Sequence, residues 1–322
     1  MTTPPQSPSS ASLPPQPTPP VAESKPPIPA SDVIIDLPSG NELDDIAAAK
    51  LQAAQQVRLI VVAGPVGAGK TTLIASLYDL FQTGKVGDYA FAWSRTLPAF
   101  ERRCHLSRIA SEREVPDTER TPLGKVRYLH SQISGPELPN GLLDLLFIDV
   151  SGEVFDGARD DISECQQLEF LKMADHFLLL MDCEKIIDLK QRNLVTHDAA
   201  VLLRSCLDSG MLSPSCLVNV LWCKYDFIAA TGNPEHDAFL ETATKELQKQ
   251  FVPEVERLSF RKVAARPAGV ERMEFGHGVP ELLKEWATKT PRDRKMNLLP
   301  DDQSGTRESE KFLERHFNTG PK

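Results

Sequence analysis

A glycine-rich octapeptide lies where an apolar run gives way to a helix-like segment. Residues 64–71 read Gly-Pro-Val-Gly-Ala-Gly-Lys-Thr, after the apolar run 57–63 and at the start of a helical pattern over 70–81. This matches the pattern G-x-x-x-x-G-K-[ST], whose glycines let successive backbone N–H groups point at phosphate oxygens. The positive end of the helix dipole adds to the attraction. The octapeptide therefore predicts a phosphate-binding loop (P-loop).

Two side chains of this loop are predicted to act on the phosphates directly. Lys70 is expected to neutralise the β- and γ-phosphates, and the Thr71 hydroxyl is expected to hold Mg²⁺. The remaining residues expected to bind the nucleotide here are Gly64, Gly67, Ala68, Gly69 and Thr72.

Strands and helices alternate along the rest of the chain, which is typical of a parallel sheet covered by helices. The expected strands are 57–63, 125–133, 142–149, 176–182, 216–223 and 258–264, and the expected helices are 42–55, 70–81, 161–173, 194–207, 236–251 and 279–286. The turn 134–141 between the second and third strands is too short for a crossover, so these two strands should form an antiparallel hairpin.

The strand 142–149 ends in a second phosphate-site pattern. Leu145-Leu146-Phe147-Ile148-Asp149 is an apolar strand that ends in an acid, and Asp149 is expected to hold Mg²⁺ through water. The next residues complete D-x-x-G, in which the Gly152 backbone N–H can sense the γ-phosphate. The alternative is an acid at a strand end that faces solvent.

A base-reading site is predicted at Trp222-Cys223-Lys224-Tyr225-Asp226, after the strand 216–223. Asp226 can accept hydrogen bonds from N1–H and the N2 amino group of guanine, a donor pair that adenine lacks. The stem of Lys224 can lie across the base plane. The pattern N-K-x-D departs here at its first position, where Cys223 replaces Asn, and this leaves an adenine nucleotide as an open alternative.

The order of P-loop, hairpin, D-x-x-G and K-x-D resembles the Ras-like branch of the translation-factor-related GTPases. More specific similarity lies in Leu37-Pro38-Ser39-Gly40, in the segment 96–103 (Thr-Leu-Pro-Ala-Phe-Glu-Arg-Arg), in 149–153 (Asp-Val-Ser-Gly-Glu) and in 264–267 (Ala-Ala-Arg-Pro). These resemble the bacterial double-GTPase family over about residues 33 to 288. The resemblance implies an α/β P-loop fold with a mostly parallel sheet, one antiparallel hairpin and helices on both faces.

The resemblance also carries roles onto single residues. Ala265 stands where Ras-like proteins offer a backbone N–H to guanine O6, and Thr121 is the nearest candidate for the switch threonine that closes over Mg²⁺. Glu153 occupies the place of the water-orienting Gln, so slow turnover is expected, with help from an arginine. Arg120 is the first candidate for that arginine, and Arg102 or Arg103 are the others.

Composition limits the partners and the compartment. The net charge of −9 would repel a phosphate backbone, so nucleic acid is not expected as a partner. No apolar run approaches the ~20 residues of a membrane helix, and residues 1–4 open no signal peptide. The six cysteines form no C-x-x-C pair and are expected to be free thiols. A cytoplasmic protein without membrane insertion is predicted.

The chain is expected to comprise a disordered Pro-rich tail at 1–32, a GTPase domain at 33–290 and a polar tail at 291–322. The predicted function is GTP binding with slow, Mg²⁺-dependent hydrolysis, acting as a nucleotide-controlled switch. The resemblance implies a multi-protein bacterial system and a second GTPase as partner. Two alternatives stay open, which are a nucleotide-dependent binding module without useful hydrolysis and an ATPase.

Overall fold

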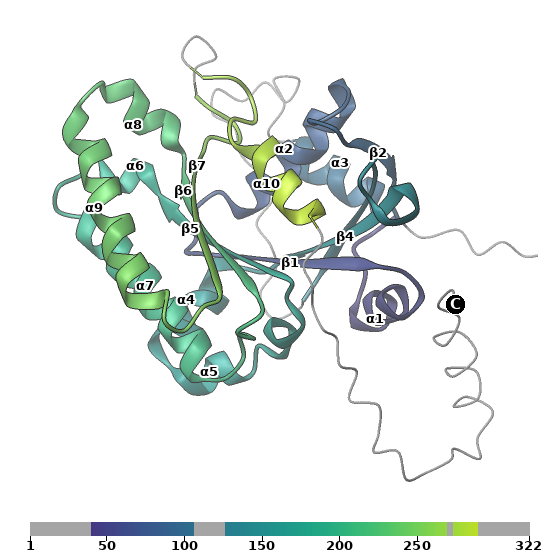
Figure 1. Cartoon of the computed structure of the whole chain (residues 1–322), viewed down its shortest axis with the longest axis horizontal. Coiled ribbons are helices and arrows are strands. Elements are labelled where there is room, and N and C mark those ends of the chain that lie inside the picture. The colour runs from purple at the N-terminus through teal and green to yellow at the C-terminus, as the bar shows by residue number, and fades with distance from the viewer. Residues whose placement is uncertain (1–39, 106–125, 269–272, 289–322) are drawn as a thin grey trace, which may run out of the picture. The chain divides into compact units, whose positions relative to one another are not determined.

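The computed structural model describes residues 40–105, 126–268 and 273–288 (Figure 1). Its strands are β1 (Val57–Ala63), β2 (Ala90–Trp93), β3 (Tyr128–Ser134), β4 (Leu142–Asp149), β5 (His176–Asp182), β6 (Leu217–Cys223) and β7 (Arg257–Val263). Its α-helices are α1 (Asp45–Ala54), α2 (Lys70–Thr83), α3 (Leu97–His105), α4 (Gly152–Asp160), α5 (Ile162–Gln166), α6 (Cys183–Ile186), α7 (Arg192–Asp208), α8 (Tyr225–Thr231), α9 (Pro234–Phe251) and α10 (Val279–Ala287). The expected tails at 1–32 and 291–322 lie outside the described residues.

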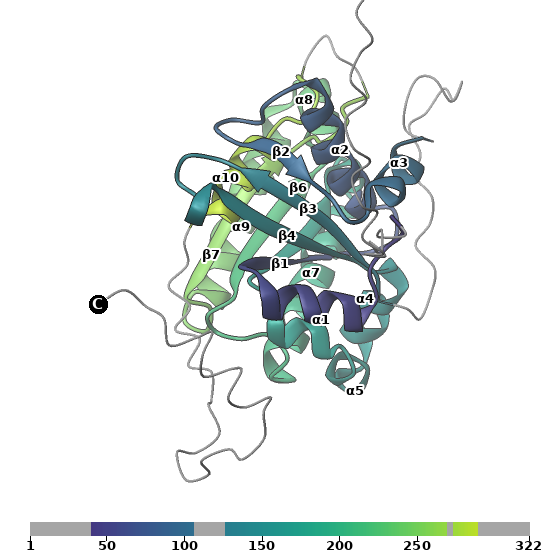
Figure 2. The ribbon, with the colours of Figure 1, turned by 90° about the vertical axis from the view of Figure 1, so that its right-hand side faces the viewer.

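The strands form one seven-stranded sheet in the order β2-β3-β4-β1-β5-β6-β7, which is seen edge to edge in Figure 2. β4, β1, β5, β6 and β7 run parallel, while β3 is antiparallel to both β4 and β2. The turn between β3 and β4 passes through Asn140 and Gly141, which both have positive φ. The predicted fold class, with its hairpin and mostly parallel sheet, is confirmed.

Each face of the sheet carries its own apolar core, because successive strand side chains point to opposite sides. In β1, Leu59 and Val61 belong to one core, and Ile60 and Val62 belong to the other. The helices that pack on the first face are α1, α4, α5, α6, α7, α8 and α9, and those on the second are α2, α3 and α10. The expectation of helices on both faces is therefore correct.

The segment between α2 and β3 contains two elements that the sequence pattern did not predict, β2 and α3. β2 is four residues long and pairs only at the edge of the sheet. A single residue of the neighbouring β3, His130, holds the following turn. The Arg95 backbone N donates to His130 Nδ1 at 2.9 Å, and Ser94 Oγ donates to the His130 backbone carbonyl at 2.6 Å. Tertiary contacts, more than the local sequence pattern, determine the conformation of this segment.

The helix expected over 161–173 is broken into shorter pieces. α4 already begins at Gly152, α5 follows from Ile162, and a 3₁₀ turn covers Glu169–Met173. Asp161 separates α4 from α5, because its side chain accepts a hydrogen bond from the Ser163 backbone N at 2.7 Å and so caps the second helix. The break leaves α4 as a separate helix directly after D-x-x-G.

Candidate functional site

The predicted nucleotide-binding residues lie at the carboxyl ends of the parallel strands. β1 leads into residues 64–69, β4 into 150–152, β6 into 224–226 and β7 into 264–268. Since β4, β1, β5, β6 and β7 are neighbours in the sheet, their carboxyl ends meet along one edge. This edge is the usual ligand-binding side of an open α/β sheet.

The P-loop has the backbone that its glycines permit. Gly67 and Gly69 have φ of 80° and 94°, and an added Cβ at either would meet nothing within 4 Å. Glycine is therefore needed at these two positions for conformation and not for packing. Lys70 is buried, and its Nζ donates to the carbonyl oxygens of Gly64 at 2.9 Å and Pro65 at 3.0 Å. Burial lowers the pKa of Lys70, which the nearby charge of Asp149 partly offsets.

Two of the three predicted magnesium ligands, Thr71 and Asp149, lie next to each other. Thr71 Oγ1 is 3.2 Å from Asp149 Oδ1 and 3.3 Å from Oδ2, and Asp149 is fully buried. A hydroxyl and a carboxylate are hard oxygen ligands, which suit Mg²⁺. Within the described ranges, no group of three His, Cys, Asp or Glu could hold a metal by itself. A site of this kind takes its remaining ligands from phosphate and water.

Gly152 and Glu153 begin α4 beside the P-loop, but the two differ in their surroundings. Gly152 is buried, and an added Cβ would lie 2.4 Å from Val66 N and 2.6 Å from Pro65 C, both backbone atoms of the P-loop. Glu153 is exposed in the first turn of α4. The start of α4 is thus in direct contact with the P-loop backbone, and the predicted water-orienting residue lies at the surface of that junction.

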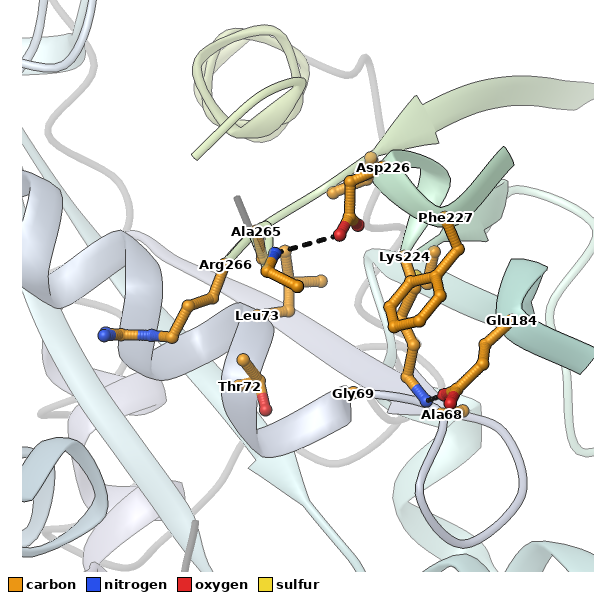
Figure 3. A pocket seen from close by; sticks show the side chains of 13 residues that line it. Ala68, Gly69, Thr72, Leu73, Glu184, Lys224, Asp226, Phe227, Ala265 and Arg266 are labelled. Carbon is orange, nitrogen blue, oxygen red and sulfur yellow. Dashed lines mark hydrogen bonds and ion pairs between the residues drawn. The ribbon is translucent and has the colours of Figure 1, made fainter. Parts of the chain in front are cut away.

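A pocket beside the phosphate-binding residues is lined by the side chains that are predicted to recognise the nucleotide base (Figure 3). Its lining includes Thr72, Lys224, Asp226 and Ala265. Oδ2 of Asp226 accepts a hydrogen bond from the Ala268 backbone N at 3.0 Å. The pocket adjoins the P-loop, because Ala68 and Gly69 also line it.

Lys224 has positive φ at 55°, and its Nζ contacts two acids. Asp182 Oδ2 lies at 2.9 Å and Glu184 Oε2 at 2.7 Å. Burial alone would lower the pKa of Lys224, but hydrogen bonds and charges of the two acids raise it above its ordinary value. Cys223, at the position where the pattern has Asn, is buried, and burial raises the pKa of its thiol. A neutral thiol therefore stands where an amide is usual.

The sequence reading missed three residues at this site. Glu184 and Phe227 line the base pocket, and no motif identifies them. Glu42 is joined to the phosphate side through Arg103, which the sequence offered only as an alternative to Arg120. Arg103 is buried and donates from Nε to Asp149 Oδ2 at 3.2 Å and from Nη1 to Glu42 Oε1 at 2.6 Å. Arg120 and Thr121 lie outside the described residues.

The P-loop, the hairpin, and the order of the strands and site residues define a Ras-like P-loop nucleotide-binding protein. The sequence profile of the Double-GTPase 2 family matches residues 58–287. The chain belongs to this double-GTPase family and is a GTP-binding protein. Comparison with curated proteins finds no match. No helix in the described parts of the chain has both the length and the apolar character needed to cross a membrane.

Proposed function

We propose that this protein is a slow, Mg²⁺-dependent GTPase that works as a nucleotide-controlled switch. The observation that carries the proposal is the contact between the start of α4 and the P-loop backbone at Gly152, 2.4 Å from Val66 N for an added Cβ. With so little space, α4 cannot keep its position if the loop or its phosphate contacts change. A ligand that alters this junction shifts the position of a whole helix.

The described side chains supply the phosphate chemistry. Lys70 would leave the carbonyl oxygens of Gly64 and Pro65 for the β- and γ-phosphates. Thr71 and Asp149 would hold Mg²⁺, which neutralises charge on the phosphate oxygens when bound. The Gly152 N–H would donate to the γ-phosphate, so that hydrolysis releases α4.

Slow turnover follows from the residue after D-x-x-G. Glu153 is exposed at the start of α4, where its carboxylate could order water but would also repel the γ-phosphate. A regulatory protein benefits from a long-lived triphosphate state. The resemblance further implies that the partner is a second GTPase within a multi-protein bacterial system, and we include this in the proposal.

Guanine selectivity is proposed for the pocket that Asp226 lines. Its carboxylate accepts a backbone hydrogen bond, and it lines the pocket together with Ala265, Thr72 and the P-loop residues Ala68 and Gly69. The carboxylate can exchange the Ala268 N–H for the N1–H and N2 amino group of guanine. Adenine offers no matching donor pair, so an ATPase is the less favoured alternative.

A paired measurement tests the proposal on the full chain. Affinities for GDP, GTP, ADP and ATP with Mg²⁺ should show a preference for guanine of at least tenfold, and radiolabelled GTP should be hydrolysed more slowly than once per minute. Tight GTP binding without measurable turnover would favour the binding module. Equal affinity for ATP would remove the guanine assignment and favour the ATPase.

A further inference from the structure

We propose that Arg103 is the built-in counter-ion of the magnesium site. In this view its guanidinium neutralises Asp149 while no metal is bound and leaves that carboxylate when Mg²⁺ arrives with the nucleotide. The inference rests on the proposed function, because it takes Asp149 as a magnesium ligand. The inference adds to the proposed site a residue of α3, Arg103, whose contacts change when Mg²⁺ binds.

The contacts place the guanidinium and the metal ligands on the same carboxylate. Oδ2 of Asp149 accepts from Arg103 Nε at 3.2 Å and lies 3.3 Å from Thr71 Oγ1. Arg103 is 5% exposed and Asp149 is 0% exposed. A buried carboxylate without a partner is costly, so a cation at this position is needed whenever Mg²⁺ is absent. Lys70 does not fill that place, because its amine is bonded to P-loop carbonyl oxygens.

A second acid holds the other end of the guanidinium. Nη1 of Arg103 donates to Glu42 Oε1 at 2.6 Å and to the Ala99 carbonyl at 3.3 Å. Glu42, just before α1, therefore competes with Asp149 for the same cation. When Mg²⁺ takes Asp149, the guanidinium keeps a counter-charge in Glu42. We call the chain Glu42–Arg103–Asp149 the arginine latch.

Hydrogen bonds to the sheet and to the segment before α1 hold the N-terminal part of α3, the helix that carries Arg103, in place. The His130 backbone N donates to Thr96 Oγ1 at 2.9 Å, and His130 Nε2 contacts Asp144 at 2.7 Å within β3 and β4. The Ala99 backbone N also donates to the Gly40 carbonyl at 3.1 Å. These contacts join α3 to the sheet and to the segment before α1. They leave Arg103, near the end of α3, as the group that meets the phosphate side.

The charge of Arg103 is expected to lower the affinity of the site for Mg²⁺. A dication that Asp149 holds through water lies close to a guanidinium on the same carboxylate, and the two cations repel each other strongly at low dielectric. Mg²⁺ must therefore displace Arg103 from Asp149, and the latch weakens the binding of the metal. Two of the similar segments, Gly40 and 96–103, have no role in the phosphate chemistry. The Ala99–Gly40 hydrogen bond and the contacts of Arg103 with Glu42 and Asp149 join them to the magnesium site.

The test is a Mg²⁺ titration of the full chain saturated with ribose-labelled fluorescent GDP. R103Q removes the competing charge, so the Mg²⁺ concentration at half-maximal signal should fall about tenfold, as expected for a lost hydrogen bond between charged groups. K85Q is the control, because it also removes one positive charge, but Lys85 is exposed and takes no part in the latch. Its midpoint should stay within twofold of the wild type.

The results of this titration distinguish a failure of the latch from a failure of the proposed function. An R103Q midpoint within twofold of wild type, or an equal shift in K85Q, overturns the latch and leaves the proposed function standing. A wild type that binds GDP without any response to Mg²⁺ overturns the proposed function itself. If R103Q does not fold, the arginine Nε–H NMR spectrum of the wild type replaces it, with R103K used for assignment. The Arg103 signal should then move on addition of Mg²⁺, and a signal that stays in place overturns the latch.

Discussion

Substituting Gly152 by Ala is the sharpest available test of the junction between α4 and the P-loop. An added Cβ would lie 2.4 Å from Val66 N, 2.6 Å from Pro65 C and 2.8 Å from Val66 Cα. Ordinary contact begins at 3.4 Å, so the shortfall against Val66 N is 3.4 − 2.4 = 1.0 Å. All three neighbours are backbone atoms of the P-loop, so a side-chain rotation cannot relieve the clash.

The size of the effect follows from two opposing contributions. Overpacking of a tight site costs about 1 to 3 kcal/mol. Alanine at a helical position recovers up to about 1 kcal/mol relative to glycine. With the full gain from alanine, the free energy of unfolding of Gly152→Ala should therefore fall by up to about 2 kcal/mol, as measured by urea denaturation. Because the displaced atoms belong to the P-loop, affinity for a non-hydrolysable GTP analogue should fall at least tenfold.

Gly157 offers a matched control in the same helix. An added Cβ there would meet only the end of the exposed Glu164 side chain, with Oε2 at 1.9 Å, and this flexible carboxylate can move away. Gly157→Ala should raise the unfolding free energy by up to about 1 kcal/mol, because alanine is the better helix former, and should leave the nucleotide affinity unchanged. If Gly152→Ala behaves like Gly157→Ala, the close contact does not constrain α4, and the switch proposal loses its main support.

Three further changes test separate parts of the site. Lys70→Ala should weaken GTP binding at least a hundredfold in equilibrium titration, because it removes the charge that faces the phosphates, whereas the exposed Lys85→Ala should not. Asp226→Asn should lower GTP affinity and raise affinity for xanthosine triphosphate, since an amide can donate to the second carbonyl of xanthine; an unchanged preference would contradict the role of Asp226. Glu42→Gln should flatten the acid side of the stability profile. Burial raises the pKa of Glu42, but the hydrogen bond and charges of Arg103 and the charge of Arg102 outweigh this and hold the pKa below its ordinary 4.5, so the wild type gains stability above that pH and loses it as the pH falls further. Urea unfolding at pH 6 and pH 3.5 should show a smaller loss in the variant than in the wild type, and equal losses would refute the pairing.

The local sequence was sufficient to predict the P-loop and every strand of the sheet except β2. Apolar runs such as 57–63 and 176–182 become strands buried on both faces, because no other placement removes so many side chains from water. The octapeptide at 64–71 needs glycine for positive φ at Gly67 and Gly69, and that need is visible without tertiary contacts. The hairpin was predictable for the same local reason, since a connection of eight residues cannot cross the sheet.

Only the tertiary structure determined the edge strand β2, the helix α3 and the burial of Arg103. β2 and α3 carry weak local patterns, and contacts from His130 and Gly40, distant in sequence, hold them in place. Arg103 and Arg102 are neighbours of the same type, yet one is buried against Asp149 and the other is exposed. A sequence shows which residues can carry charge, but burial and pairing depend on which segments pack together, and this decides which of these two arginines is buried against Asp149.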